Sequence, residues 1–393
     1  MNTKLRSLLA LQSLRIAHLR EDFPLSVSIC VNLWPIPVSV VAGRAVLSSA
    51  IAIASVFIAS RANAATLPSA TPCMALLDRF TAPDVPALGP GETAAPAGGW
   101  TNGITPPNLP GKGLAQHPML YAGENYNKMF LINNGKVLWT YSTGGGYEYD
   151  DIWMLSNGNI LFSRMQYAAE VTPKKEVVWR LDAPNGTEIH TVQPIGLDKV
   201  LLVENGQPAP KLLVVNTKTK AVEVDHALDP CGATHAQFRR IRMTAAGTYL
   251  TPYLQANKVV EYDKDFKVVW SYAIKSPWAA LRLKNGNTLI TDEQESLTRE
   301  VNPKGETVWE FKSSDLPAPY KFSEAPQSCT RLANGNTILT SRGGGGKGPQ
   351  LIEVTPDKKV VWVLQDWKTL GSASAVQILD DPGIPESPGE SEH

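Results

Sequence analysis

The sequence predicts an all-β fold, a six-bladed β-propeller with four-stranded blades, and three observations support this. Short apolar runs rich in β-branched and aromatic residues alternate with Asn-Gly and Pro-Lys-Gly turns, as in residues 267–312. A tryptophan after a valine or leucine marks the last run of a unit and returns about every 40 residues or a multiple of that. The spacing is longer only before the last tryptophan, where a Gly-rich stretch is inserted. The series is Trp139, Trp179, Trp270, Trp309 and Trp362. A four-stranded unit cannot bury both faces alone, so its repetition around a ring is expected.

The repeat places the blades in order along the chain. The last strand of blade 1 is expected at Lys136–Ser142, and the next five blades at Asp150–Leu181, Glu188–Leu228, Thr234–Ala273, Pro277–Lys312 and Phe322–Gln365. Blade 1 has no run for a first strand, whereas one run, residues 374–379, remains after blade 6. We therefore predict a propeller over residues 114–381 in which residues 374–379 complete blade 1, because ring closure removes open sheet edges.

Residues 1–64 are predicted to be a leader with a secretory signal peptide. Arg44 precedes an apolar run, residues 45–59, and Ala62-Asn63-Ala64 has the small-x-small form of a signal-peptidase site. The run is short for a bilayer span, which favours a cleaved signal over an uncleaved anchor. We expect a periplasmic or secreted protein with no stable membrane insertion after cleavage. No basic stripe is present, which predicts no nucleic-acid partner.

Two segments flank the predicted propeller. Residues 65–113 are rich in Pro, Gly and Ala and are expected to form a linker or a strap laid over the propeller. Residues 382–393 are expected to be a disordered tail. Three cysteines follow the leader and permit at most one disulfide; they are Cys73, Cys231 and Cys329. No Cys-x-x-Cys or Cys/His pair has metal-ligand spacing, so the sequence predicts no structural metal.

Candidate functional residues are sought on the innermost strands, because these strands line the channel of a propeller. His190 and His235 fall near the start of the innermost strands expected in adjacent blades. Together with Arg239 they have the residue types of a nucleophile or a general acid and base working on an anion. The alternative is that both histidines are ordinary hydrogen-bonded residues.

Arginines form a second feature of these strands. Arg242, Arg282 and Arg331 occupy equivalent positions in three consecutive blades. Repetition favours structural ion pairs between blades, with Asp292, Glu300 or Glu353 as partners, over a ring of anion-binding guanidinium groups. Arg240, like Arg239, is not repeated, so these two are better ligand candidates. The remaining candidate binding residues are an acidic and aromatic wall and two neighbours on the innermost strands, namely Asp150, Asp151, Trp153, Gln237 and Trp278.

The blade motif resembles a known family. Lys-x-Val-Val-Trp followed by Leu-x-Asn-Gly-Asn-Thr is similar to the PQQ-like repeats of bacterial exported propellers, and in particular to the six-bladed arylsulfotransferases, over Met119 to Asp381. The resemblance implies a channel histidine that takes a sulfuryl group, a part that His235 or His190 would play with Arg239 and Arg282. The chain lacks the vicinal cysteines and the length of the quinone-binding enzymes, which implies no cofactor.

Three functions remain open from the sequence. The first is a propeller that binds a small anionic or carbohydrate ligand in its channel, with a protein partner on one propeller face as a further possibility. The second is a sulfuryl-group transferase of the arylsulfotransferase kind. The third is a polysaccharide lyase, which needs the same histidine and arginine types to neutralise and deprotonate a uronate.

Overall fold

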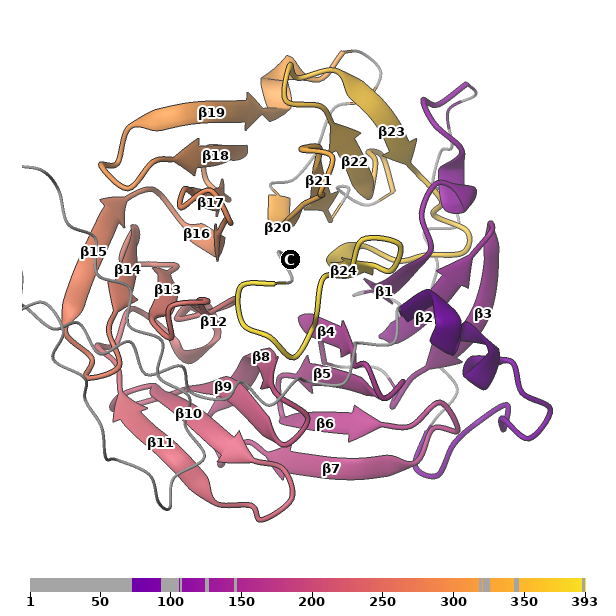
Figure 1. The fold of residues 1–393 in the computed structure, drawn as a ribbon, viewed down its shortest axis with the longest axis horizontal. Coiled ribbons are helices and arrows are strands. Elements are labelled where there is room, and N and C mark those ends of the chain that lie inside the picture. Colours follow the sequence, from indigo (N-terminus) through magenta and orange to yellow (C-terminus); the bar gives the residue numbers. More distant parts are fainter. Residues whose placement is uncertain are drawn as a thin grey trace, which may run out of the picture. The chain divides into compact units, whose positions relative to one another are not determined.

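The computed structural model describes residues 73–92, 106, 108–123, 127–144, 147–317, 320, 326–342, 346–390 and 393. Six four-stranded antiparallel sheets surround a common axis, the channel axis (Figure 1). The six-bladed β-propeller predicted from the repeat is confirmed. The predicted leader lies outside the described residues. No helix among the described residues is long and apolar enough to cross a membrane.

The blades follow one another along the chain, and within each blade the strands are named in order from the axis outward. Blade 1 consists of β24 (Ala373–Ile378), β1 (Met119–Gly123), β2 (Lys128–Asn133) and β3 (Lys136–Tyr141). Blade 2 consists of β4 (Asp151–Met154), β5 (Ile160–Arg164), β6 (Tyr167–Val171) and β7 (Val177–Asp182). Blade 3 consists of β8 (Glu188–Ile195), β9 (Lys199–Asn205), β10 (Lys211–Asn216) and β11 (Val222–Ala227).

The second half of the ring has the same order. Blade 4 consists of β12 (Arg242–Met243), β13 (Tyr249–Tyr253), β14 (Lys258–Tyr262) and β15 (Val268–Ala273). Blade 5 consists of β16 (Pro277–Arg282), β17 (Thr288–Asp292), β18 (Leu297–Val301) and β19 (Thr307–Lys312). Blade 6 consists of β20 (Pro326–Arg331), β21 (Thr337–Ser341), β22 (Leu351–Val354) and β23 (Val360–Leu364). Short 3-10 helices are η2 (Cys73–Phe80), η3 (Gly113–Ala115), η4 (Thr234–Ala236) and η5 (Ser313–Asp315).

The repeated tryptophan links several blades to the next one along the chain. Nε1 of Trp270 donates a hydrogen bond to the carbonyl of Pro303, and Nε1 of Trp309 donates to the carbonyl of Pro356, in each case a turn of the following blade. Hydrophobic cores lie between neighbouring blades; one of them joins Leu250 of blade 4 to residues of blade 5. The sequence repeat is therefore a repeat of contacts between blades, as expected where each unit is stabilised by its neighbours.

The ring closes as the sequence predicted. β24 pairs antiparallel with β1, so the C-terminal part of the chain supplies the innermost strand of blade 1. Beside this seam, His117 lies before β1 and Asp380 after β24, and His117 Nδ1 is 3.2 Å from Asp380 Oδ2. His117 Nε2 is 3.1 Å from Glu353 Oε2 of blade 6. The histidine thus joins both ends of the ring to the neighbouring blade.

Residues 73–92, the larger described part of the segment expected to be a linker or a strap, pack against blades 1 and 2. In η2, Leu77 and Phe80 are buried in the core between blades 1 and 2, and the Phe80 ring lies 5.5 Å from that of Trp139. Glu92 accepts a hydrogen bond from the Ser142 amide and forms an ion pair with Lys175 of blade 2. These residues cover the outer strand of blade 1.

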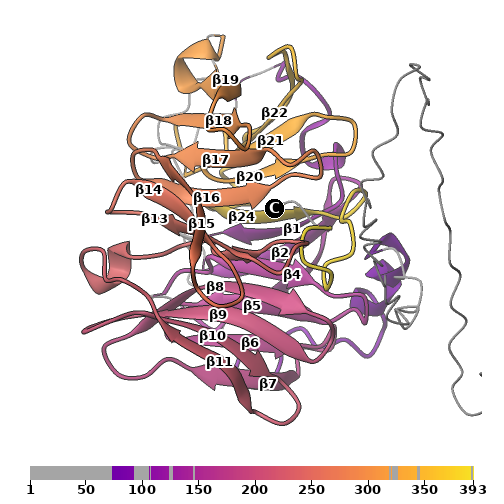
Figure 2. The ribbon, with the colours of Figure 1, turned by 60° about the vertical axis from the view of Figure 1, so that its left-hand side comes forward.

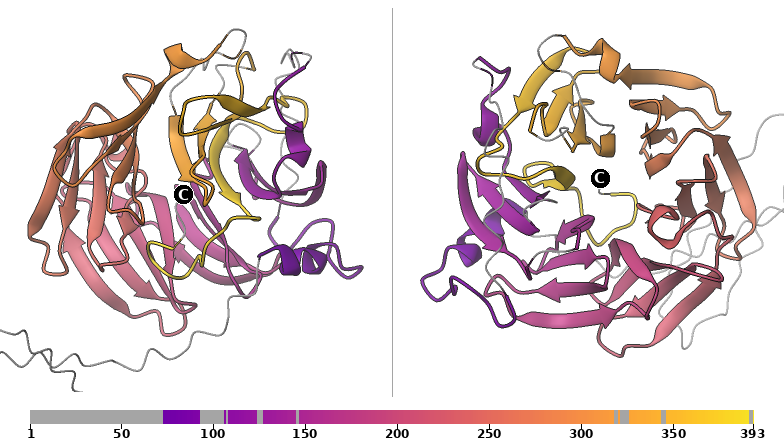
Figure 3. Two further views of the ribbon diagram at one scale, coloured as in Figure 1. Left: turned by 45° about the horizontal axis from the view of Figure 1, so that its top comes forward. Right: turned by 180° about the vertical axis from the view of Figure 1, so that it is seen from behind.

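The tail differs from the expectation of disorder. The Ser156 amide donates to Glu386 Oε1, and Lys284 forms an ion pair with Glu390. The C-terminal end of the chain, marked C, lies near the channel axis in Figure 1, and Figure 2 and Figure 3 show the ring from three further sides. Composition alone suggested disorder, but the tail carries acidic side chains that find backbone and lysine partners on the ends of the innermost strands. The three cysteines of the described part of the chain are buried free thiols.

Candidate functional site

The innermost strands begin at one end of the channel, because every blade repeats the same strand order. Asp150 and Glu188 lie at the start of the inner strands of blades 2 and 3. Blade 4 departs from the pattern: its inner strand β12 is reduced to two residues, and η4 and a loop take the place of the expected strand from Thr234. His235 and Arg239 therefore come from this loop and not from a strand, which corrects the predicted alignment of blade 4.

His190 is the buried centre of the cluster at this end of the channel. Its Nδ1 is 2.7 Å from Asp150 Oδ2, and its Nε2 is 2.8 Å from Glu188 Oε2. A neutral imidazole has one N–H donor, so the ring donates to one carboxylate only unless it takes up a second proton. Burial acts to raise the pKa of Asp150, but the charge and hydrogen bond of His190 outweigh burial, and the pKa lies below its usual value.

His235 is the exposed member of the cluster. Its side chain is 49% exposed, Nδ1 is 2.9 Å from Glu188 Oε2, and Nε2 is 3.9 Å from Glu148 Oε1. The rings of His190 and His235 are 5.1 Å apart and nearly perpendicular. Burial and the positive charge of Arg239 lower the pKa of His235 below its usual value, against the hydrogen bond that the ring donates to Glu188. Both histidines therefore meet at one carboxylate oxygen.

Arg239 has the least satisfied guanidinium of the candidates. It is buried, its guanidinium carbon lies 4.6 Å from the centre of the Trp278 ring, and Nη1 donates to the Phe238 carbonyl at 3.3 Å. Its Nε has no hydrogen-bond partner among the described residues. Its charge acts on both Asp150 and His235. Arg239 is thus a fixed positive group at the edge of the histidine cluster with donor capacity to spare.

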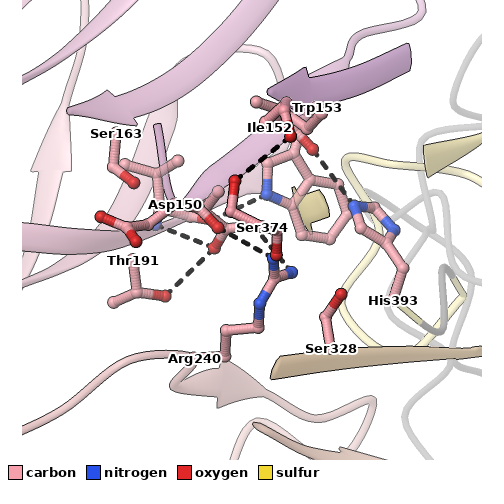
Figure 4. A network of polar contacts seen from close by, with 12 residues as sticks. Asp150, Ile152, Trp153, Ser163, Thr191, Arg240, Ser328, Ser374 and His393 are labelled. Atoms are coloured by element: carbon pink, nitrogen blue, oxygen red, sulfur yellow. Dashed lines mark hydrogen bonds and ion pairs between the residues drawn. The ribbon is translucent and has the colours of Figure 1, made fainter. Parts of the chain in front are cut away.

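Arg240 and Arg242 are engaged deeper in the channel. Both form ion pairs with Asp151, and Arg240 Nη2 also donates to the backbone carbonyls of Asp150 and Ser374, as Figure 4 shows. Arg242 lies 5.1 Å from the ring of Trp153. Arg240 and Arg242, two of the candidate ligand-binding arginines, therefore already have carboxylate partners within the chain.

The tail occupies this deeper layer as well. The His393 ring lies 3.9 Å from that of Trp153, and its Nε2 donates to the Ile152 carbonyl at 3.2 Å (Figure 4). The backbone oxygen of His393 accepts from Arg242 Nε. Burial lowers the pKa of His393 to about 3, so the ring is neutral. The deeper candidates Trp153 and Arg242 thus already have a partner within the chain.

The repeated arginines have the structural role that their repetition favoured. Arg282 forms an ion pair with Glu261 of blade 4, and Arg331 pairs with Glu300 of blade 5, the partner named from the sequence. Each guanidinium also lies near the repeated tryptophan of the preceding blade. The third member, Arg242, differs because its partner Asp151 is on the inner strand of blade 2. Gln237 holds loops together by bonding the backbone of Gly206.

Sequence reasoning missed two carboxylates of the site. Glu188 starts the strand that carries His190, and Glu148 precedes β4; neither belongs to the repeat. A signal was available for Glu188, because Glu-x-His on a strand directs both side chains to one face. No signal was available for Glu148, since it lies in a connection whose path the repeat does not define.

Comparisons with known proteins support the fold and do not assign a family. No protein-family description and no curated protein matches the chain. Among solved structures, a protein of unknown function from Bacteroides caccae is 26% identical, with a TM-score of 0.60 over 66% of this chain and 97% of the other. Virginiamycin B lyase from Staphylococcus aureus is 13% identical, with a TM-score of 0.48 over 67% and 90%. The first match agrees with a propeller.

Proposed function

We propose that this propeller binds a small anionic ligand at the end of the channel where the innermost strands begin, with Arg239 and His235 as its contacts. The observation that carries the proposal is the buried guanidinium of Arg239, whose Nε has no partner among the described residues. A buried donor without an acceptor costs about 1–3 kcal/mol. A carboxylate, sulfate or phosphate group would supply that acceptor and match the planar fork.

The other channel arginines make the contrast sharper. Arg240, Arg242, Arg282 and Arg331 each have a carboxylate partner within the chain, so an anion would have to displace it. Arg239 has stacking on Trp278 and one backbone acceptor. Its neighbour His235 is exposed and adds a polar contact at the solvent side. Glycans fall within the proposed class when they carry a carboxylate or a sulfate.

A direct binding experiment tests this proposal. Isothermal titration of the purified full chain with 4-methylumbelliferyl sulfate, glucuronate and inorganic sulfate compares wild type with Arg239→Met. The matched control is Arg299→Met, which removes a guanidinium paired with Glu310 on the outer part of blade 5. We expect one anion to bind wild type and the control, and to bind Arg239→Met at least about tenfold more weakly. Equal binding by both variants would refute the proposal.

A second candidate function is group transfer through His235, in the manner of the arylsulfotransferases that the blade motif resembles. The favouring observation is that Glu188 accepts from the Nδ1 side of His235, which orients Nε2 as a nucleophile or base. The assay is release of 4-methylumbelliferone in the presence of a phenol acceptor. Turnover that is lost in His235→Ala supports transfer, and turnover that persists there excludes His235 as the nucleophile.

Export belongs to the proposal as well. The apolar run at residues 45–59 and the small-x-small site at residues 62–64 support cleavage and delivery to the periplasm or the medium. N-terminal sequencing of the protein recovered from fractionated cells tests this, because cleavage after Ala64 gives a new N-terminus at Ala65. An intact N-terminus in the cytoplasmic fraction would contradict export.

A further inference from the structure

The cluster that faces Arg239 has the composition of a cation site. Two groups of side chains, which share His190, bring their ligand atoms within 4.8 Å of one another: Glu188, His190 and His235, and Glu148, Asp150 and His190. Three carboxylates and two imidazoles thus meet in one place, with burial increasing from the exposed His235 to the buried Asp150. Neutral imidazole and carboxylate are ordinary ligands of divalent transition metals.

The spacing of the donor atoms suits a single ion. Glu188 Oε2 is 2.8 Å from His190 Nε2 and 2.9 Å from His235 Nδ1. Two donors that each lie about 2.1 Å from one ion are separated by roughly 3 Å when the angle at the metal is near 90°. The three side chains are therefore close to the separation that adjacent ligands of one ion need, and small side-chain movements would admit it.

The surroundings of His190 supply an independent argument. Its other ring nitrogen, Nδ1, is 2.7 Å from Asp150 Oδ2, so Nδ1–H donates to the carboxylate and Nε2 is left as the lone-pair nitrogen toward Glu188. A carboxylate, a histidine and a metal in this order form the arrangement that commonly orients a metal-ligating histidine. A carboxylate oxygen of Asp150 also lies within 4.8 Å of one of Glu148. Two carboxyl groups so close need a proton or a cation between or beside them.

We propose that His190 Nε2, His235 Nδ1 and Glu188 bind one divalent first-row transition metal ion, with Asp150 orienting His190. The ligands bind as neutral imidazoles and an ionised carboxylate, so any proton held between Glu188 and the two rings is released to solvent on binding. Three protein ligands leave positions open toward the exposed side of His235. An anionic ligand held by Arg239 would meet the ion there.

The inference goes beyond anion binding and constrains the role of His235. When Nδ1 ligates a metal, the remaining ring hydrogen is on Nε2, which then donates a hydrogen bond and cannot act as a nucleophile. A metal-bound cluster therefore supports an anion-binding role for His235 and opposes the group-transfer alternative. Metal binding is measured without any anionic ligand, so it can fail or succeed separately from the proposed function.

The purified full chain is first stripped of metal with EDTA. Isothermal titration calorimetry then measures the binding of Zn²⁺ and, in a second series, of Mn²⁺. We expect one Zn²⁺ or Mn²⁺ per chain, and at least about tenfold weaker binding by His235→Ala and by Glu188→Gln. The matched controls are His226→Ala and Glu223→Gln, since both residues are on β11, the outermost strand of blade 3. Both controls should bind the ion as wild type does.

Two further readouts keep the outcome decisive. Circular dichroism and thermal unfolding identify a variant that fails to fold; His235 is exposed on η4, so its replacement is expected to fold. Arg239→Met should keep the metal and lose the anion, which separates this inference from the proposed function. Wild type that takes up no ion, or a His235→Ala and Glu188→Gln double variant that binds the ion as tightly as wild type, overturns the proposal.

Discussion

The His117 clamp at the ring seam makes stability depend on pH. Burial acts to lower the pKa of His117, but the hydrogen bonds to Asp380 and Glu353 outweigh it and raise the pKa from 6.5 to about 9. A raised histidine pKa means that folding favours the protonated ring. The stabilisation is therefore complete below pH 6.5 and is lost as the pH rises through 9.

The size of the effect follows from that pKa. At about 1.4 kcal/mol for each pKa unit, the rise corresponds to at most about 3.5 kcal/mol. The His117 side chain is 12% exposed, whereas that of Asp380 is 44% exposed, so solvent screens part of the interaction. We expect about 2 kcal/mol to be lost between pH 6 and pH 9.5.

The assay compares wild type with His117→Gln by urea unfolding at pH 6, 7.5 and 9.5, with tryptophan fluorescence as the signal that reports unfolding. The difference in the free energy of unfolding between the two proteins should shrink from about 2 kcal/mol at pH 6 to a few tenths at pH 9.5. His226→Gln is the control, because burial lowers the pKa of His226 and its contribution changes in the opposite direction. A difference between wild type and His117→Gln that is constant with pH would refute the reasoning.

Further predictions concern the blades and the thiols. Arg331→Met should lower the free energy of unfolding by about 2–3 kcal/mol, because Glu300 is left buried without its cation. Arg180→Met removes an exposed ion pair with Asp182 and should change the free energy of unfolding by less than about 0.5 kcal/mol. Urea unfolding measures both. Deleting residues 372–393 removes β24 and should abolish cooperative unfolding, whereas deleting 382–393 should preserve it. Ellman's reagent should leave Cys73, Cys231 and Cys329 unreacted until urea unfolds the chain, since burial raises their thiol pKa values to about 11 or 12. Rapid native-state reaction of any of these three would contradict their burial; Cys30, in the predicted leader, is counted separately.

The fold could be predicted because its information is local and repeated. The turn in Leu-x-Asn-Gly-Asn-Thr and the final tryptophan each make the same contact in several blades: Asn287 donates to Glu300 within its blade, and Trp270 reaches the next one. Blade 1 had no first strand in the sequence, and one apolar run remained after blade 6. Pairing the two was the one way to close the ring. The contacts that residues 73–92 and the tail make could not be predicted, because they depend on surfaces that exist only after the ring has formed.

The site could be predicted only in part, for a related reason. His190 and His235 were placed together because both lie near the start of neighbouring innermost strands. Their shared partner Glu188 was missed, and Arg240 was preferred as a ligand candidate although it pairs with Asp151. Side-chain partners across blades depend on register and rotamer, and neither is encoded in a spacing along the chain.

Departure from the repeat is a better guide to the site than residue type. Blade 4 keeps β13, β14 and β15 but reduces its inner strand to Arg242–Met243, and the residues released from strand pairing form η4 and a loop. Arg282 and Arg331, which follow the repeat, have carboxylate partners supplied by the preceding blade. Arg239 and His235, which come from the irregular loop, have donor capacity or exposure that the fold does not use. Local rules are broken where function needs side chains free, so the loop of blade 4 is where ligand and metal experiments should begin.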